Sequence, residues 1–494
     1  MNRPVTVRAQ IVAVVICAML SGGCSLFPPM GPDYRRPAAQ ATFDASRSSV
    51  FSLESPPDRW WELYQDASLN HYITIALREN RDLRAAASRL SIAQSLLDQV
   101  AAQQLPSTTV SASLERSRST IPGELGLHVH NNVAFTLGAS YEIDLFGRIR
   151  RSIEASQADV EEQQYTFAAT QIQIVANTLR AYLNVCNANA ALVATKRTIK
   201  IDRDTYAATR RLADGGGTSQ LDVTRARAQL ESDEATVPLL EAQRTAALYA
   251  LATLLGRQPD QFPQEASQCT KPPTLERPIP TGDGLALLRR RPDVLQAERA
   301  LASATANIGV TEASLYPQIT VGLSIGSSAS TIPNTLRAAS RTWSIGPLLQ
   351  WTFPNQAIAR AQLREAGANA DLAMSTYENT VLTALKETET ALDSYARELD
   401  HLALVQRTRD SNQTAFDQAN SLYRRGATSF LDLLSAQKSL ALSEQQLVAS
   451  AGSVATDQVT VFLALGGGWG DYAQRAAEQA KAATERRTSQ SVLQ

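Results

Sequence analysis

Hydrophobic and polar residues alternate in four short stretches of this chain. In residues 133–145, VAFTLGASYEIDL, every second side chain is apolar and those between are small or polar. The same alternation occurs at 108–115, at 319–326 and at 342–353, where Pro347 interrupts it. Because successive side chains of a strand point to opposite faces, each stretch predicts a β-strand with one apolar and one polar face.

Long helices are predicted after each pair of strands. Residues 148–214 and 368–425 contain no Gly or Pro, and a helix of the first length would extend on the order of 100 Å at about 1.5 Å per residue. A second helix is expected to return from each of them, at 218–255 and 428–465. Three residues are expected to mark kinks or breaks in these helices: Pro238, Gly367 and Gly452.

The turn between the helices of each pair occurs twice with nearly the same sequence. The shared residues are Gly216, Thr218, Ser219, Leu221 and Asp222 in the first copy and Gly426, Thr428, Ser429, Leu431 and Asp432 in the second. Each glycine would end the incoming helix in a left-handed conformation, and the following Thr or Ser would cap the outgoing one. Each aspartate has capping-box spacing in the first turn of the outgoing helix.

These repeats divide the chain into two halves of similar build, as expected of a duplicated unit. The predicted organisation, in chain order, is a signal peptide (1–23), a lipidated N-terminal segment and equatorial region (24–70), a first repeat of one helix, two strands and two long helices (71–256), a Pro-rich crossover (257–283), a second repeat of the same elements (284–468) and a polar C-terminal tail (469–494).

The N-terminus has the parts of a bacterial lipoprotein signal. Arg3 and Arg8 precede the apolar run 11–20, and the small residues SGG lead to Cys24. Such a run is too short to span a bilayer as a helix, so we expect an exported chain. The segment LSGGCS resembles a lipobox whose Leu lies one position early, and we predict that Cys24 carries acyl chains such as palmitate. Ordinary cleavage nearby, leaving Cys24 as a free thiol, is the alternative.

Composition argues against several functions. A formal net charge of −1 offers no positive excess for nucleic acid. The chain has no Gly-rich phosphate loop and no nucleophile signature, so we expect no catalytic residue and no cofactor. Outside the signal, Cys186 and Cys269 remain for a disulfide or a metal, but no zinc-type spacing occurs and no metal site is predicted. We interpret RRR at 289–291 as a solvated helix start and HVH at 128–130 as an exposed loop.

The four strands fit either a sheet on a soluble core or part of an outer-membrane barrel. Trp343 and Trp351 lie roughly 26 Å apart if both are on one strand, near the spacing of interfacial aromatic girdles. Two core tryptophans are the alternative. An open sheet edge in lipid leaves backbone groups unsatisfied, so four membrane strands would require more copies of the chain. Two chains would supply eight strands and three would supply twelve.

Several longer motifs carry a family resemblance: GPDYRRP (31–37), WWELYQDASLN (60–70), YEIDLFGRIRRSIEA (141–155), RRPDVLQAERALASATANIGVTEASLYPQI (290–319) and the two turns. With them the chain resembles the outer-membrane factor family, the TolC-like and OprM-like channels of tripartite systems, and in particular the NodT-type efflux lipoproteins. The resemblance implies an α+β membrane protein. Three protomers would form a twelve-stranded outer-membrane β-barrel, four strands per chain, continued by a long periplasmic α-helical barrel with an equatorial region.

By the same resemblance the chain would be a passive exit duct and not an enzyme. It would be lipid-anchored in the cell outer membrane, extend into the periplasm, and export drugs or other small toxic molecules. Its partners would be a periplasmic adaptor (a membrane fusion protein), an inner-membrane pump of the resistance-nodulation-division type and outer-membrane lipid, with no nucleic acid. Two alternatives stay open: an exit duct of a type I protein secretion system, and a periplasmic coiled-coil scaffold with a small soluble β-domain.

The resemblance also assigns roles to the two turns. The residues from Gly216 to Leu221 and from Gly426 to Leu431 would dock the adaptor. Asp432, with Asp222 as its equivalent, would form an acidic ring at the periplasmic gate, where like charges in a constricted mouth would raise pKa values. The family's next aspartate is Ser435 here, so a second ring is not expected. Helix capping alone is the other interpretation of both aspartates.

Overall fold

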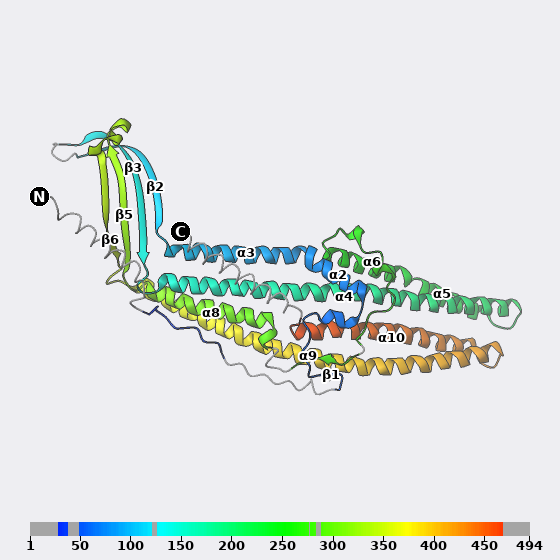
Figure 1. Cartoon of the computed structure of the whole chain (residues 1–494). Coiled ribbons are helices and arrows are strands. Elements are labelled where there is room, and N and C mark those ends of the chain that lie inside the picture. The colour runs from blue at the N-terminus through cyan, green and yellow to red at the C-terminus, as the bar shows by residue number, and fades with distance from the viewer. Residues whose placement is uncertain (1–27, 38–48, 121–125, 276, 283–287, 468–494) are drawn as a thin grey trace. The chain divides into compact units, whose positions relative to one another are not determined.

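The structure of the chain is a computed structural model that describes residues 28–37, 49–120, 126–275, 277–282 and 288–467. It comprises two compact units (Figure 1). Unit 1 is made of residues up to Pro37, Leu90–Gln163 and Ala297–Tyr377, and unit 2 is made of Ala38–Arg89, Gln164–Gln296 and the chain from Glu378 onward. The signal peptide, Cys24 and the tail 469–494 lie outside the described residues, so these assignments stay predictions.

The elements follow the predicted order. In chain order they are β1 (Phe51–Ser52), α2 (Ala67–Glu79), α3 (Arg81–Ala101), β2 (Ser107–Ser119), β3 (His128–Ile143), α4 (Arg148–Asp214), α5 (Gln220–Glu234), α6 (Val237–Leu254), β4 (Ile279–Pro280), α8 (Pro292–Ala313), β5 (Gln318–Ala329), β6 (Arg341–Gln350), α9 (Ala357–Arg424) and α10 (Phe430–Ala464). Short 3-10 helices are η2 (Trp60–Tyr64), η3 (Ala102–Gln104), η4 (Pro259–Gln261), η5 (Ala266–Gln268), η6 (Ile332–Leu336) and η7 (Ala338–Ser340). A helix, two strands and further helices thus occur twice, in the same order.

Strands β2, β3, β5 and β6 form one antiparallel sheet in that order within unit 1 (Figure 1). Its register places apolar residues in a row across all four strands: Val110, Leu137, Ile325 and Trp343. The adjacent row, on the opposite face, is small and polar: Thr109, Gly138, Ser324 and Ser344. The alternation read from the sequence therefore gives a sheet with one apolar and one polar face.

The apolar face of this sheet has no core of its own among the described residues. Every residue of β6 is exposed, and Val110 on β2 and Trp343 on β6 are 84% and 74% exposed. Trp351 is also exposed, so the alternative of two core tryptophans is wrong. A soluble sheet would bury such a face against its own core, so the exposed face favours the membrane alternative over a sheet on a soluble core.

Three details of the strands differ from the predictions. Pro347 lies inside β6, which continues past it because an edge strand tolerates a residue without an N–H group. Trp351 lies just beyond the end of β6, where its Nε1 donates a hydrogen bond to the Leu315 carbonyl at 3.0 Å. The HVH motif forms the start of β3, paired with the end of β2, and not a loop. Backbone pairing continues there through polar residues that show no apolar alternation.

The long helices agree with the prediction in extent but not at every break. α4 spans the whole stretch without Gly or Pro, and a break does separate α5 from α6 just before Pro238. Gly367 and Gly452 interrupt nothing, because they lie inside α9 and α10. The role of Gly452 is close packing: a Cβ there would lie 2.7 Å from the Asn187 Nδ2 atom of α4.

Unit 2 has a buried core that joins distant parts of the chain. Trp60 is fully buried and stacks on Phe462 of α10, with ring centroids 4.7 Å apart. β1 and β4 pair in parallel, which joins the N-terminal segment to the crossover. Cys186 and Cys269 form a disulfide, which settles the choice that the sequence left open.

Within the described residues, one helix is long and apolar enough to cross a membrane by length and composition, namely α10. Half of its apolar stretch is buried inside unit 2, and Val459, Val461 and Phe462 have no exposed surface. Packing in the core therefore accounts for the apolar composition of α10.

Candidate functional site

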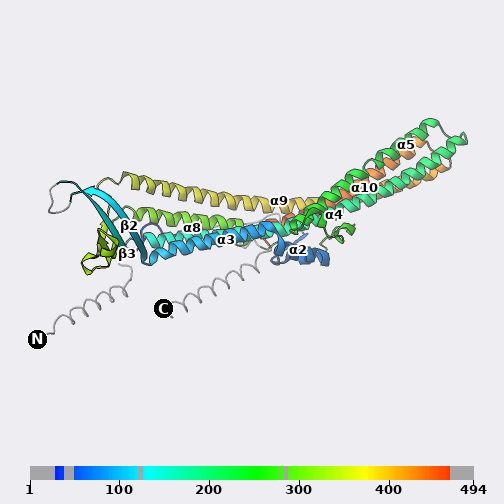
Figure 2. The same cartoon turned by 90° about the horizontal axis from the view of Figure 1, so that it is seen from above.

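The two repeated turns lie together at one end of unit 2 (Figures 1 and 2). A small apolar cluster joins the helices there: Ala226 of α5 with Phe430 and Leu434 of α10, packed against Tyr206 and Tyr423. The structure thus brings together the two sets of candidate tip residues. Leu221 and Leu431, one from each turn, are 56% and 57% exposed, so each presents an apolar side chain to solvent.

Glycine ends the incoming helix of each pair as predicted. Gly216 and Gly426 have φ angles of +76° and +71°, in the left-handed region. The turns also close alike, because the amide of Gly217 donates to the Leu212 carbonyl at 2.7 Å and that of Ala427 to the Leu422 carbonyl at 3.0 Å. These bonds satisfy carbonyls that the end of a helix would otherwise leave unpaired.

Alanine substitutions at two glycines should have effects of opposite sign. Neither Gly426 nor Gly367 has a neighbouring atom within 4 Å of a built Cβ, so sterics with neighbours do not distinguish them. We expect Gly426→Ala to lower the free energy of unfolding by about 1 kcal/mol, because alanine is strained at positive φ. Gly367→Ala, inside α9, should raise it by about 0.5–1 kcal/mol.

Chemical unfolding of the purified protein, followed by circular dichroism, tests this pair. A destabilisation of equal size in both variants would contradict a conformational role for Gly426.

The serine and aspartate of each turn form helix caps. Ser429 Oγ accepts from the Asp432 amide at 3.2 Å, while the Asp432 carboxylate accepts from the Ser429 amide at 3.2 Å, which completes a capping box. The same carboxylate accepts from the hydroxyls of Thr428 and Ser429, each at 2.7 Å. In the first copy, Asp222 accepts from the hydroxyls of Thr218 and Ser219, at 2.9 and 2.8 Å.

These hydrogen bonds set the acidity of the two aspartates within one protomer. The Ser429 and Thr428 hydroxyls hold the pKa of Asp432 below its usual value. Burial acts to raise the pKa of Asp222, but the Ser219 and Thr218 hydroxyls outweigh it and the pKa is lowered. This direction is opposite to the one expected for a ring of like charges, and it follows from hydrogen bonds to the charged form. Both aspartates cap helices, as their spacing predicts. These contacts do not limit the aspartates to capping, so the gate role stays a proposal.

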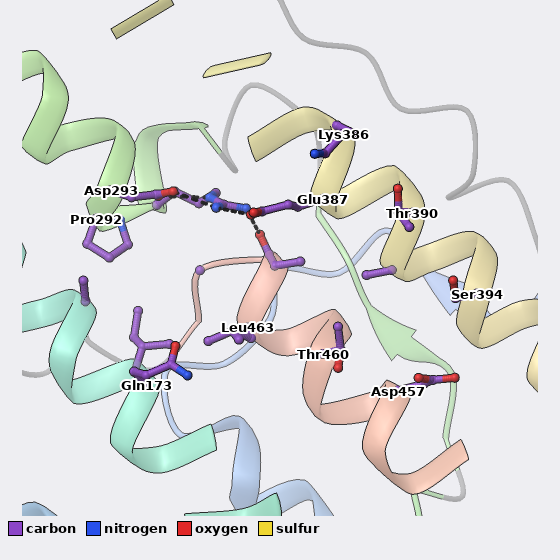
Figure 3. Close-up of a pocket in the computed structure, with 16 residues that line it drawn as sticks. Gln173, Pro292, Asp293, Lys386, Glu387, Thr390, Ser394, Asp457, Thr460 and Leu463 are labelled. Carbon is purple, nitrogen blue, oxygen red and sulfur yellow. Dashed lines mark hydrogen bonds and ion pairs between the residues drawn. The ribbon is translucent and has the colours of Figure 1, made fainter. Parts of the chain in front are cut away.

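A second candidate site is a hollow of about 570 Å³ in unit 2 that is lined by both apolar and polar residues (Figure 3). It lies between α4, the start of α8, α9 and the end of α10. Its polar lining includes Gln173, Asp293, Lys386, Glu387, Thr390, Ser394, Asp457 and Thr460. Burial, followed by the charge of Glu398, raises the pKa of Asp457.

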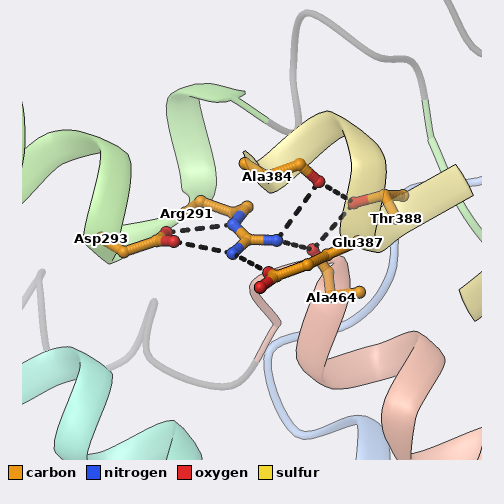
Figure 4. Close-up of polar contacts among 6 residues, drawn as sticks. All are labelled: Arg291, Asp293, Ala384, Glu387, Thr388 and Ala464. Atoms are coloured by element: carbon orange, nitrogen blue, oxygen red, sulfur yellow. Dashed lines mark hydrogen bonds and ion pairs between the residues drawn. The ribbon is translucent and has the colours of Figure 1, made fainter. Parts of the chain in front are cut away.

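Arg291 forms one wall of this hollow and is only 7% exposed (Figure 4). Its guanidinium donates two hydrogen bonds to Asp293, at 2.7 and 3.0 Å, and one to Glu387 at 2.7 Å. It also donates to the carbonyl of Ala464, the last residue of α10, at 3.1 Å. A cation at the carboxyl end of a helix is favourable because of the helix dipole and the unpaired carbonyls there.

The interpretation of residues 289–291 as a solvated helix start is therefore wrong for Arg291. The residue does precede the first turn of α8, but its side chain is buried by elements distant in the sequence. Of the three arginines, only Arg289 is exposed, while Arg290 is half-buried and donates to the Pro56 carbonyl at 2.9 Å. No local sequence signal distinguishes the buried arginine from the exposed one.

The motif GPDYRRP forms an arm in unit 1 that lies against α4 and α8. Arg151 of α4, itself buried, donates to the Met30 carbonyl at 2.9 Å and to Asp33 at 2.8 Å. Glu298 of α8 accepts from the Tyr34 hydroxyl at 3.0 Å and pairs with Arg36 at 2.8 Å. The motif is thus explained by polar contacts that hold the arm in place.

Metal chemistry finds no support in the described part of the chain, where no group of three or more His, Cys, Asp or Glu side chains is placed to hold an ion. Of the two histidines of HVH, His130 lies within 3.5 Å of the Ser117 hydroxyl. The sites therefore consist of caps, ion pairs and exposed apolar side chains, which can bind and position partners.

A chain that combines an uncovered apolar β-sheet with helices of 67 and 68 residues has the features of an outer-membrane channel subunit. Comparison with known proteins agrees. The chain belongs to the outer membrane efflux protein family, whose model matches residues 72–257 and 286–467.

Individual relatives extend over almost the whole chain. The toluene efflux pump outer membrane protein TtgC of Pseudomonas putida is 30% identical, over 96% of this chain and 99% of its own length. The cation efflux system protein CusC of Escherichia coli O6:H1 is 28% identical, over 92% of this chain and 97% of its own. Among solved structures, the outer-membrane channel OprN is 33% identical with a TM-score of 0.85, and the match covers 89% of this chain and 99% of that one. The mixed helix-and-strand fold and the outer-membrane location are those of this family.

Proposed function

We propose that the chain is the passive exit duct of a tripartite efflux system, in which three protomers form a channel through the outer membrane. The observation that carries the proposal is the sheet. It has an exposed apolar face and two edge strands, β2 and β6, each with a single partner strand among the described residues. In lipid such edges must be paired, so the sheet needs strands from further copies, and three copies supply twelve.

Small molecules are the cargo that the comparisons favour over proteins. TtgC and CusC are named for efflux of toluene and of cations. For this chain we propose drugs or other small toxic molecules, delivered by an inner-membrane pump of the resistance-nodulation-division type through a periplasmic adaptor. The duct itself supplies no energy, and transport is driven by the pump. The exposed Leu221 and Leu431 at the tips fit an adaptor-docking surface.

The N-terminal arm supports the proposed lipid anchor. Met30 and Asp33 are held on α4 by Arg151, only a few residues after Cys24. A lipid on Cys24 would therefore be tethered to unit 1, which also contains the four strands that we propose cross the membrane.

The acidic ring at the periplasmic mouth is the part of the proposal that a channel measurement tests directly. We expect purified protein in a planar bilayer to show discrete conductance steps with a preference for cations. Asp432→Asn keeps the hydrogen-bond acceptor of the cap and removes the charge. It should lower the cation-to-anion permeability ratio by roughly two- to five-fold, because a charged constriction concentrates counter-ions. Ser435→Asp, which adds a carboxylate one helical turn further along, should raise the ratio.

Two other outcomes would refute the proposed duct or the gate role of Asp432. Protein that needs no detergent and never conducts would exclude the duct and favour the periplasmic scaffold. Conduction with the same ion preference in wild type, Asp432→Asn and Ser435→Asp would leave the duct intact and limit Asp432 to its capping role.

A further inference from the structure

A buried carboxylate lies between three helices near the tips. Asp202 of α4 is 1% exposed, and Gln437 of α10, itself 4% exposed, donates a hydrogen bond to its Oδ1 atom. Gln437 is oriented by Thr205, whose hydroxyl donates to the Gln437 Oε1 atom at 3.3 Å. A buried acid without a cation is costly in its charged form, so this arrangement needs an explanation.

The surroundings of the second carboxyl oxygen of Asp202 explain how this buried acid is tolerated. No donor among the described residues reaches Asp202 Oδ2, and the carboxylate of Asp233 on α5 lies within hydrogen-bonding reach of the Asp202 carboxyl group. Two carboxylates form a hydrogen bond only when one of them holds a proton. Asp233 also accepts from Gln229 at 2.8 Å, which fixes its orientation. A proton that Asp202 holds and donates to Asp233 in a hydrogen bond satisfies both groups.

The surrounding charges favour retention of that proton. Burial, then the contact with Asp233, raises the pKa of Asp202 to about 7, although the Gln437 bond acts in the opposite direction. Glu234 of α5 adds further negative charge, and the nearby Arg203 of α4 pairs with Glu234 at 2.8 Å.

From α10, the group that faces Asp202 is the uncharged Gln437. Farther along the same helices, Glu444 of α10 pairs with Arg197 of α4 at 3.9 Å and with Arg409 of α9 at 3.5 Å. These arginines are thus engaged with another carboxylate.

Asp202 and Asp233 lie where a contact between them can affect the mobility of the tips. Asp233 lies at the end of α5, directly before the break that separates it from α6. Gln437 lies on α10 between Leu434 and Leu440, which belong to two small clusters that join the helices near the turns. We propose that Asp202 holds a proton and donates it in a hydrogen bond to Asp233, which joins α5 to α4 beside Gln437 of α10 near the tips. Loss of this proton leaves a buried charge that loosens the three helices. This inference goes beyond the proposed duct, since it concerns contacts within one protomer and needs no conduction.

The direction of the pH effect follows from linkage. When the three helices separate, Asp202 is hydrated and has the pKa of an ordinary aspartate. When they are packed together, Asp202 binds its proton more tightly. The contact between Asp202 and Asp233 is complete below the ordinary pKa of an aspartate and is lost as the pH rises through the folded value near 7. The equilibrium constant for local opening should rise roughly tenfold per pH unit between about pH 5 and about pH 7, and should level off above that.

Hydrogen exchange of the full-length protein in detergent measures this opening directly. Peptides covering residues 196–208, 226–240 and 432–442 would be followed from about pH 5.5 to about pH 8.5, with rates corrected for intrinsic exchange. We expect wild type to lose protection in these peptides as the pH rises, and Asp202→Asn to show no such dependence, because its amide donates to Asp233 at every pH.

Two further variants keep the test decisive. Asp233→Asn can donate to the Asp202 carboxylate and should also abolish the response, so it replaces Asp202→Asn if that variant does not fold. Asp204→Asn changes an exposed carboxylate on the same helix and should keep the wild-type profile. A flat profile in wild type, a response retained in Asp202→Asn or Asp233→Asn, or a response lost in Asp204→Asn would overturn the proposal. None of these results depends on whether the protein conducts.

Discussion

Replacing Arg291 by methionine is expected to lower the free energy of unfolding by about 2–4 kcal/mol, a large effect for one side chain. The substitution keeps much of the apolar volume but removes every donor of the guanidinium. Asp293 and Glu387 lose their shared cation, and the carbonyl of Ala464 at the end of α10 loses its hydrogen bond. The expected loss of unfolding free energy is moderate because the two carboxylates are partly exposed and can be hydrated in the variant.

The neighbouring arginine provides a matched control. Arg290→Met removes the same charge one residue earlier, but Arg290 is half-buried and its ion pair with Asp58 is long, at 3.4 Å. It should cost less than about 1 kcal/mol. Arg291→Lys should fall between the two, since one ammonium cannot reproduce the planar fork that binds Asp293 and Glu387 together.

The midpoint of guanidinium unfolding, followed by circular dichroism in detergent, measures all three variants. Equal shifts for Arg290→Met and Arg291→Met would show that charge, and not the buried network, accounts for the effect.

Arginine on the apolar face of the sheet should prevent stable insertion into the membrane. Leu323 lies near the middle of β5, in a row with Ala139 and Ile345 on the apolar face. In a barrel that face meets lipid, and an arginine near the bilayer midplane costs about 2–4 kcal/mol. For Leu323→Arg we therefore expect a loss of roughly 30- to 1,000-fold in the equilibrium between inserted and uninserted protein.

The next residue of the same strand is the control. Ser324 points to the opposite, polar face, where its hydroxyl lies 2.9 Å from that of Ser344. In a barrel this face lines the water-filled interior, so Ser324→Arg should leave insertion nearly unchanged. Refolding into lipid vesicles, with the inserted fraction read from protease protection, compares the two variants. Insertion that is equally impaired or equally retained in both would exclude a lipid-facing role for the apolar face.

Features that depend on neighbouring residues could be predicted from the sequence. The four strands follow from apolar alternation, because the side chains of a strand point alternately to its two faces. The extent of α4 and the positions of the two turns follow from where Gly and Pro occur, and the spacing of Asp222 and Asp432 predicts that they cap helices. Local rules were misleading at Pro347, in the HVH motif and at Gly452, where a neighbouring strand or helix intervened. At Gly367 the helix simply continues, because a single glycine inside a helix is tolerated at a cost of about 1 kcal/mol.

Contacts between distant residues could not be predicted from the sequence and are known only from the fold. The disulfide between Cys186 and Cys269, the burial of Arg291 against the end of α10 and the contact of Asp202 with Asp233 each join residues that are far apart in the sequence. No local signal marks Asp202 among the acids of α4 or Arg291 among three consecutive arginines. Strands, helices and turns follow from local patterns, since periodicity and turn chemistry act within a few residues. Which polar side chains are buried, and with which partners, was decided by helix packing, because burial depends on segments that meet only in the folded chain.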